Sequence, residues 1–156
     1  MSYNSILEAI KTNSEINPGK LCVGDKKNKE TYGQFWKMIN KGAAYLEKNG
    51  VKKGDVVVLR GAQKVEYLFS IFSIQLLGAI ACPLEKAVKE DRILEIMNFV
   101  ETKYFLDTKK LKDTSAECIS LKEMFKEAMN DETECDVNKY ELPKSDDLSE
   151  ILFTTG

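Results

Sequence analysis

Apolar residues along this chain alternate between short uninterrupted runs and longer segments. The stretch from 54 to 84 shows this most clearly. Val56 to Leu59 is a run of four apolar residues, typical of a strand buried on both faces, as in parallel sheets. A helix is predicted from Lys64 to Leu77, ended by Gly78, and a second apolar strand from Ala79 to Leu84. Strand, helix and strand predict a right-handed βαβ unit.

The helix predicted over 64–77 is apolar around nearly its whole circumference, and residues 67–84 carry no charge. A helix of this kind is buried on all sides, in a protein core or in a membrane. Ser70, Ser73, Gln75, Gly78 and Pro83 interrupt the stretch and favour a protein core over a membrane span. We therefore expect this helix to lie between two layers, only one of which this chain obviously supplies.

The remaining segments extend the same α/β pattern. A capping box at Thr31 and Gln34 starts a helix that Asn49 and Gly50 end. Before it, a short amphipathic helix is predicted within 1–16, capped by Asn4 or Ser2, and a hairpin is predicted to join 21–23 with 30–32. After the central unit, the pattern predicts a helix over 92–100, a strand over 104–106, a helix capped by Ser120 and Glu123, and a strand over 151–153. Residues 130–147 are acidic and polar and predict a mobile linker. The fold class expected is α/β, an open, mainly parallel sheet with helices on both faces.

Composition narrows the functional classes. The net charge of −2, with Lys and Asp or Glu interspersed, gives no case for nucleic acid or an anionic membrane. The chain has no histidine, which removes Ser-His and Cys-His catalysis, and its four cysteines form no CxxC pair, so we expect no metal site. Without a signal peptide, the cysteines predict reduced thiols in a cytoplasmic protein.

The candidate binding residues stand at the end of the chain, where the predicted strand 151–153 leads into Thr154, Thr155 and Gly156. Glycine lets a backbone approach a phosphate, and threonine hydroxyls add hydrogen-bond donors. From these residues alone, a phosphate-binding loop and an ordinary turn after a strand both remain open. The chain contains neither a GxGxxG motif after a strand nor a Walker pattern.

The order of several short motifs resembles a known family. These motifs are Thr31-Tyr32, Gly50-Val51, Lys53-Gly54-Asp55, Glu66, Gly78-Ala79, Pro83-Leu84, Arg92-Ile93, Asp146-Asp147-Leu148 and Ile151-Leu152-Phe153-Thr154-Thr155-Gly156. Together they resemble the amino-terminal part of the AMP-forming adenylating ligases, a superfamily of acyl-CoA synthetases, luciferases and peptide-synthetase adenylation domains. The ending is similar to the start of the family's loop Tyr-Thr-Ser-Gly-Thr-Thr-Gly-x-Pro-Lys. Glu85-Lys86 departs from the Asn/Asp-Pro that often follows Pro-Leu in the family, so contacts from that loop are not carried over.

The resemblance implies that 1–156 is a partial amino-terminal, AMP-binding domain that ends inside the phosphate loop. The parent would activate a carboxylic acid with ATP and Mg²⁺ as an acyl-adenylate. It would then transfer the acyl group to the thiol of coenzyme A or a carrier-protein phosphopantetheine. Thr154, Thr155 and Gly156 would bind the β- and γ-phosphates, and no residue is a candidate catalyst.

We expect the 156-residue piece alone to be inactive, to hold no cofactor, and to self-associate where the missing remainder of the ligase would cover it. The sequence does not identify the acid. The alternative is a non-catalytic, flavodoxin-like binding domain complete at this length.

Overall fold

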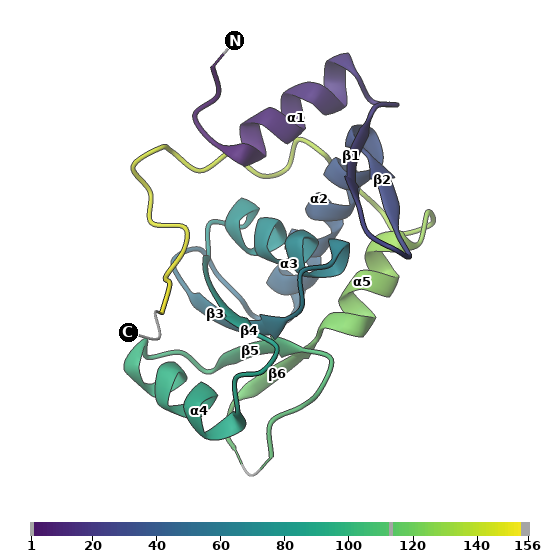
Figure 1. Cartoon of the computed structure of the whole chain (residues 1–156). Coiled ribbons are helices and arrows are strands. Elements are labelled where there is room, and N and C mark those ends of the chain that lie inside the picture. The colour runs from purple at the N-terminus through teal and green to yellow at the C-terminus, as the bar shows by residue number, and fades with distance from the viewer. Residues whose placement is uncertain (1, 113, 154–156) are drawn as a thin grey trace.

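The computed structural model describes residues 2–112 and 114–153 (Figure 1). The elements in chain order are α1 (Ile6–Ile16), β1 (Leu21–Gly24), β2 (Lys29–Thr31), α2 (Tyr32–Lys48), β3 (Val56–Gly61), α3 (Val65–Leu76), β4 (Ile80–Glu85), α4 (Glu90–Phe99), β5 (Tyr104–Asp107), β6 (Glu117–Ser120) and α5 (Leu121–Met129). No helix among the described residues is both long and apolar enough to cross a membrane.

Four parallel strands form the main sheet, in the order β4-β3-β5-β6. The predicted open parallel sheet is therefore confirmed, with β3, β4 and β5 close to their expected positions. Strand β6 was not predicted from the sequence, and it pairs with β5 from Tyr104–Glu117 to Asp107–Ser120. Only Ile119 of this four-residue strand is fully buried, so it lacks the apolar run that marked the other strands.

Helices cover both faces of the sheet, as predicted (Figure 1). One face packs with α2, α3 and α5 around a core that contains Val57, Leu59 and Leu106. The opposite face packs with α4 around Val58, Cys82 and Phe105. Adjacent residues of one buried strand thus point into different cores, which is why the strand runs show no polar alternation.

Helix α3 lies between two layers, and this chain supplies both of them. One layer is the sheet, and the other is α2, which packs along α3. The two helices approach each other closely at Gly42 of α2, where a Cβ atom would overlap the Ser73 hydroxyl and lie 2.7 Å from the Phe69 ring. The expectation that the chain supplies one layer was wrong, because the amphipathic stripe of α2 was not assigned to α3. Leu68 keeps 41% of its surface exposed.

The amino-terminal elements follow the prediction with one shift in capping. Ser5, rather than Asn4 or Ser2, caps α1, since its Oγ accepts the Glu8 N–H at 3.1 Å. The capping box at Thr31 and Gln34 is present, with both reciprocal hydrogen bonds formed. Strands β1 and β2 pair as the expected antiparallel hairpin.

The predicted strand over 151–153 is not formed. A single bridge pairs Glu150 with Ala81 of β4 in the parallel sense. Ala81 donates its N–H to Ser149 O and accepts from Ile151 N–H, each at 2.9 Å. In a parallel ladder every second residue faces the same neighbour, so Pro83 is the next residue of β4 to face this segment, and it has no N–H to donate. Pairing therefore stops after Ile151.

Residues 130–147 contain no helix or strand and return from α5 to the edge of β4. Val137, Tyr140 and Leu142 pack against the larger core. Lys139 Nζ and Tyr140 Oη both donate to Glu47 Oε1 on α2, at 3.0 and 3.1 Å. These contacts define the path of the segment, while its mobility stays a prediction.

Candidate nucleotide-binding edge

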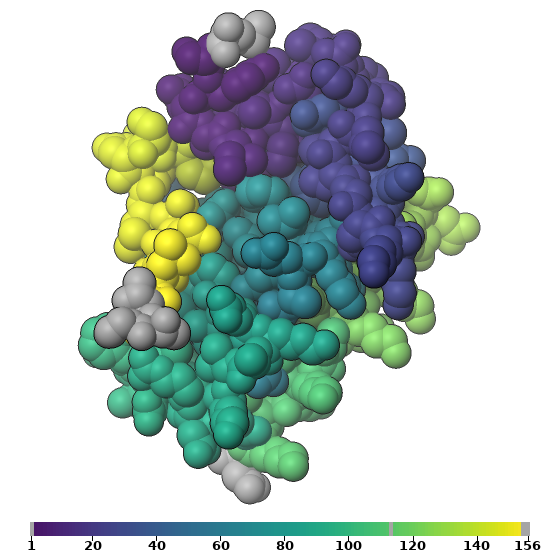
Figure 2. Space-filling model, in the orientation of Figure 1, coloured from purple at the N-terminus to yellow at the C-terminus, as the bar shows by residue number. Residues whose placement is uncertain are grey.

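The three sequence-predicted site residues, Thr154, Thr155 and Gly156, lie outside the described residues. Their approach is described, because residues 149–151 run parallel to β4 and are hydrogen-bonded to Ala81. A parallel direction carries the chain toward the carboxyl end of β4. In the space-filling view this last segment, in yellow, lies on the surface between α1 and α4 (Figure 2).

Aromatic contacts hold this segment against α4. The Phe153 ring lies 5.9 Å from the Phe99 ring, edge to face, and the Arg92 guanidinium lies 5.8 Å from the Phe153 ring centre. Ile151 and Phe153 also join the core on the α4 side of the sheet. Phe153, predicted as the strand residue before the phosphate loop, therefore packs against α4 at the end of the described residues.

The carboxyl ends of the strands are the expected ligand edge of such a sheet. Strand β3 leads into α3 on one face, and its neighbour β4 leads into α4 on the other. Where connections from adjacent strands leave toward opposite faces, a crevice opens beyond their carboxyl ends, and ligands bind there in open α/β sheets.

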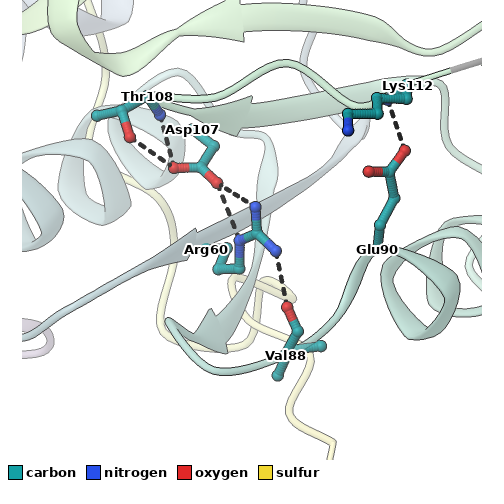
Figure 3. Close-up of polar contacts among 6 residues, drawn as sticks. All are labelled: Arg60, Val88, Glu90, Asp107, Thr108 and Lys112. Carbon is teal, nitrogen blue, oxygen red and sulfur yellow. Dashed lines mark hydrogen bonds and ion pairs between the residues drawn. The ribbon is translucent and has the colours of Figure 1, made fainter.

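Arg60, the fifth residue of β3, organises this edge (Figure 3). Its Nε and Nη2 each donate to Asp107 Oδ2 at 2.9 Å, and its Nη1 donates to the Val88 carbonyl at 2.7 Å. Asp107 ends β5 and also accepts the Thr108 N–H through its other oxygen. One guanidinium thus joins β3, β5 and the connection between β4 and α4.

A second polar contact closes the same edge beside α4 (Figure 3). Glu90, the first residue of α4, accepts the backbone N–H of Lys112. The loop after β5 is thereby tied to the helix after β4. The carboxyl edge is held by contacts between its loops as well as by the sheet.

The hairpin β1–β2 supplies the cap of α3. Lys64 occupies the N-cap position without a capping side-chain hydrogen bond, and Asp25 Oδ2 accepts the Val65 N–H at 2.9 Å. The other oxygen, Oδ1, accepts the N–H groups of Lys27 and Asn28. These backbone hydrogen bonds, that of Val65 first, lower the pKa of Asp25 below its ordinary value.

The Tyr67 hydroxyl and the thiols of Cys22 and Cys82 serve structure. Tyr67 donates to the Leu84 carbonyl at 2.9 Å, and burial is the main cause that raises its pKa to about 12. Burial likewise raises the pKa of the Cys22 and Cys82 thiols to about 11, so both are protonated and weakly nucleophilic at neutral pH. All four cysteines are free.

The described residues offer no cluster of three or more His, Cys, Asp or Glu side chains that could hold a metal ion. Within this part of the chain the arrangement can bind and position a ligand but contains no acid–base or nucleophilic pair. Arg60 and Asp107 were not predicted as site residues from the sequence. A signal existed, since each charged residue follows a buried strand run, and the register Leu59–Leu106 places them side by side.

Residues 10–156 match the model of a family described as AMP-binding enzyme. A nonribosomal peptide synthetase, tcpP of Claviceps purpurea, is 30% identical over 105 residues, 67% of this chain and 5% of the relative. The D-alanine–D-alanyl carrier protein ligase of Bacillus licheniformis is 24% identical over 65% of this chain and 20% of its own length. The chain therefore spans a small part of these relatives.

Solved structures share the fold. The amino-terminal subdomain of Klebsiella oxytoca NpsA, in complex with 3-hydroxybenzoyl-AMSN, superposes with a TM-score of 0.84 at 19% identity, over 97% of this chain and 38% of that one. O-succinylbenzoate coenzyme A synthetase (MenE) of Bacillus subtilis, in complex with AMP, gives 0.80 at 18% identity, over 94% and 38%.

Proposed function

This chain belongs to the AMP-binding enzyme family, and from that premise we propose that it is part of the amino-terminal domain of an ATP-dependent, AMP-forming ligase. The match over 10–156 supports this function over the flavodoxin-like binding module. The chain is 156 residues long and spans 5% to 20% of the relatives compared above, so the activity proposed is that of a longer parent.

In the proposed reaction a carboxylate oxygen of the acid attacks the α-phosphorus of ATP. The bond between the α-phosphorus and the bridging oxygen breaks, pyrophosphate leaves, and an acyl-adenylate forms. A thiol then attacks the acyl carbon, loses its proton and displaces AMP. The relatives named for peptide synthesis and for a carrier protein support a carrier phosphopantetheine as acceptor, and the similarity to a coenzyme A synthetase supports coenzyme A.

The observation that supports the proposal most directly is the position of residues 149–153 against β4 and α4. Pairing with Ala81 and packing of Phe153 against α4 direct the chain along β4 toward the ligand edge of the sheet. We assign Thr154, Thr155 and Gly156 to the start of the loop that binds the β- and γ-phosphates. Backbone N–H groups and hydroxyls that converge on phosphate oxygens hold the anion there. Mg²⁺ enters with these phosphates, and we assign no residue to it.

The cytoplasmic location predicted from the sequence stays a prediction, and free thiols agree with a reducing compartment.

Exchange of radioactive pyrophosphate into ATP tests the proposal. The parent should catalyse this exchange when supplied with Mg²⁺ and its acid, in a screen of fatty, aryl and amino acids. The 156-residue chain should not, because it holds only the beginning of the phosphate loop. A parent inert with every acid class, or exchange by the short chain, would contradict the proposal.

A further inference from the structure

A small cavity lies at the carboxyl ends of β3 and β5, beside the first turn of α3, with a volume of about 260 Å³. It is lined by Arg60, Gly61, Ala62, Lys64, Glu66, Tyr67, Lys86, Asp107, Thr108, Lys109 and Leu121. These residues come from strands β3 and β5, helices α3 and α5, and the loops that follow β3, β4 and β5. None belongs to segment 149–153, which leads to the proposed phosphate loop.

The lining is cationic. Arg60, Lys64, Lys86 and Lys109 stand against two carboxylates, those of Glu66 and Asp107, which gives a charge of +2 at pH 7. The whole chain carries −2. One carboxylate, Asp107, is already neutralised by its ion pair with Arg60. The concave surface therefore concentrates positive potential on an otherwise slightly acidic protein.

Arg60 gives this cavity a fixed cation. Its side chain is 17% exposed, and Asp107 and the Val88 carbonyl hold the guanidinium in place. These contacts engage three of its five N–H groups, and the other two can meet a ligand. The three lysines are exposed and flexible, so they can adapt to an anion that Arg60 orients. Asp25 already caps the amino-terminal end of α3, so the positive charge of the cavity comes from these side chains.

We propose that this cavity binds a small phosphate-type oxyanion, such as phosphate or pyrophosphate. Guanidinium and ammonium groups form charge-assisted hydrogen bonds with such oxygens. The volume is below the roughly 300–1,000 Å³ of sites that enclose drug-sized ligands, which favours a small anion over a whole nucleotide. The inference goes beyond the proposed function, because it needs neither the acid nor the loop from Thr154.

Titration of the 156-residue chain with inorganic pyrophosphate, at constant ionic strength, tests the inference. Amide chemical shifts are followed by NMR, with a parallel titration by inorganic phosphate. We expect saturable shifts at Gly61, Ala62 and Thr108 with both anions. Tighter binding of pyrophosphate would connect the cavity with the product of adenylation, and equal affinities would define a general phosphate site.

The double variant Lys86→Gln/Lys109→Gln should weaken the affinity about fivefold, since each exposed charge contributes modestly. Lys20→Gln, the same change in the loop before β1 and outside the lining, should leave it unaltered. Non-saturating shifts, shifts away from the cavity, or an unchanged affinity in the double variant would each overturn the inference. Pyrophosphate exchange by the parent reports on the loop at Thr154, so the two proposals fail separately.

Discussion

Arg60 is a single residue whose loss should affect the whole carboxyl edge. Its guanidinium makes the ion pair with Asp107 and the hydrogen bond to the Val88 carbonyl, and both side chains of the pair are largely buried, at 17% and 10% exposed. Arg60→Ala leaves the Asp107 carboxylate without its counter-ion. We expect the free energy of unfolding to fall by about 3 kcal/mol, measured by urea denaturation.

Arg92→Ala is the matched control at this scale. Arg92 pairs with Glu95 on the surface of α4, with side chains 53% and 67% exposed, so water already solvates both charges, and its guanidinium also lies over the Phe153 ring. Loss of these surface contacts should cost only about 1 kcal/mol. Equal losses for the two variants would show that the Arg60 pair has no special structural role.

At the scale of elements, Asp25 joins the hairpin β1–β2 to the start of α3 through the Val65 N–H. Its pKa is lowered in the folded protein, so the carboxylate stabilises the fold at pH values above its ordinary pKa near 4. That contribution is lost as the pH falls through the lower folded pKa. Asp25→Asn should therefore lower the thermal midpoint at pH 7, and the difference from the original protein should shrink toward pH 3.

The exposed Asp131→Asn serves as control for this pH dependence. A thermal midpoint difference for Asp25→Asn that stays constant from pH 7 to pH 3 would show that the ionised carboxylate is not the stabilising species.

The contact between α2 and α3 gives a second test at this scale. At Gly42 a new methyl group would overlap the Ser73 hydroxyl and the Phe69 ring. Gly42→Ala should destabilise the protein by about 1–3 kcal/mol through overpacking, although alanine favours helix more than glycine does. Gly19→Ala, where a Cβ meets nothing within 4 Å, should be close to neutral in the same denaturation experiment. A neutral Gly42→Ala would mean that the helices separate easily.

At the scale of the whole molecule, sequence pattern predicted what depends on local periodicity. The apolar runs at Val56–Leu59 and Tyr104–Leu106 identified buried strands because burial on both faces leaves no polar position. Strand β6 was not predicted because its pairing with β5, rather than its own composition, makes it a strand. The layer over α3 depends on which elements meet, and periodicity within one segment carries no such information. Arg60 and Asp107 could be placed at strand ends from the sequence, but their pairing depends on the register between β3 and β5.

The pairing of Glu150 with Ala81 also bears on synthesis of the chain. Ala81 leaves the ribosome 69 residues before Glu150, so the outer side of β4 emerges long before its neighbour does. An open strand edge in a nascent chain is a template for pairing with other chains. Pro83 interrupts that edge, since it cannot donate a hydrogen bond to any incoming strand. We therefore expect the same residue that limits the native pairing also to limit mispairing of the unfinished protein with its neighbours on a polysome.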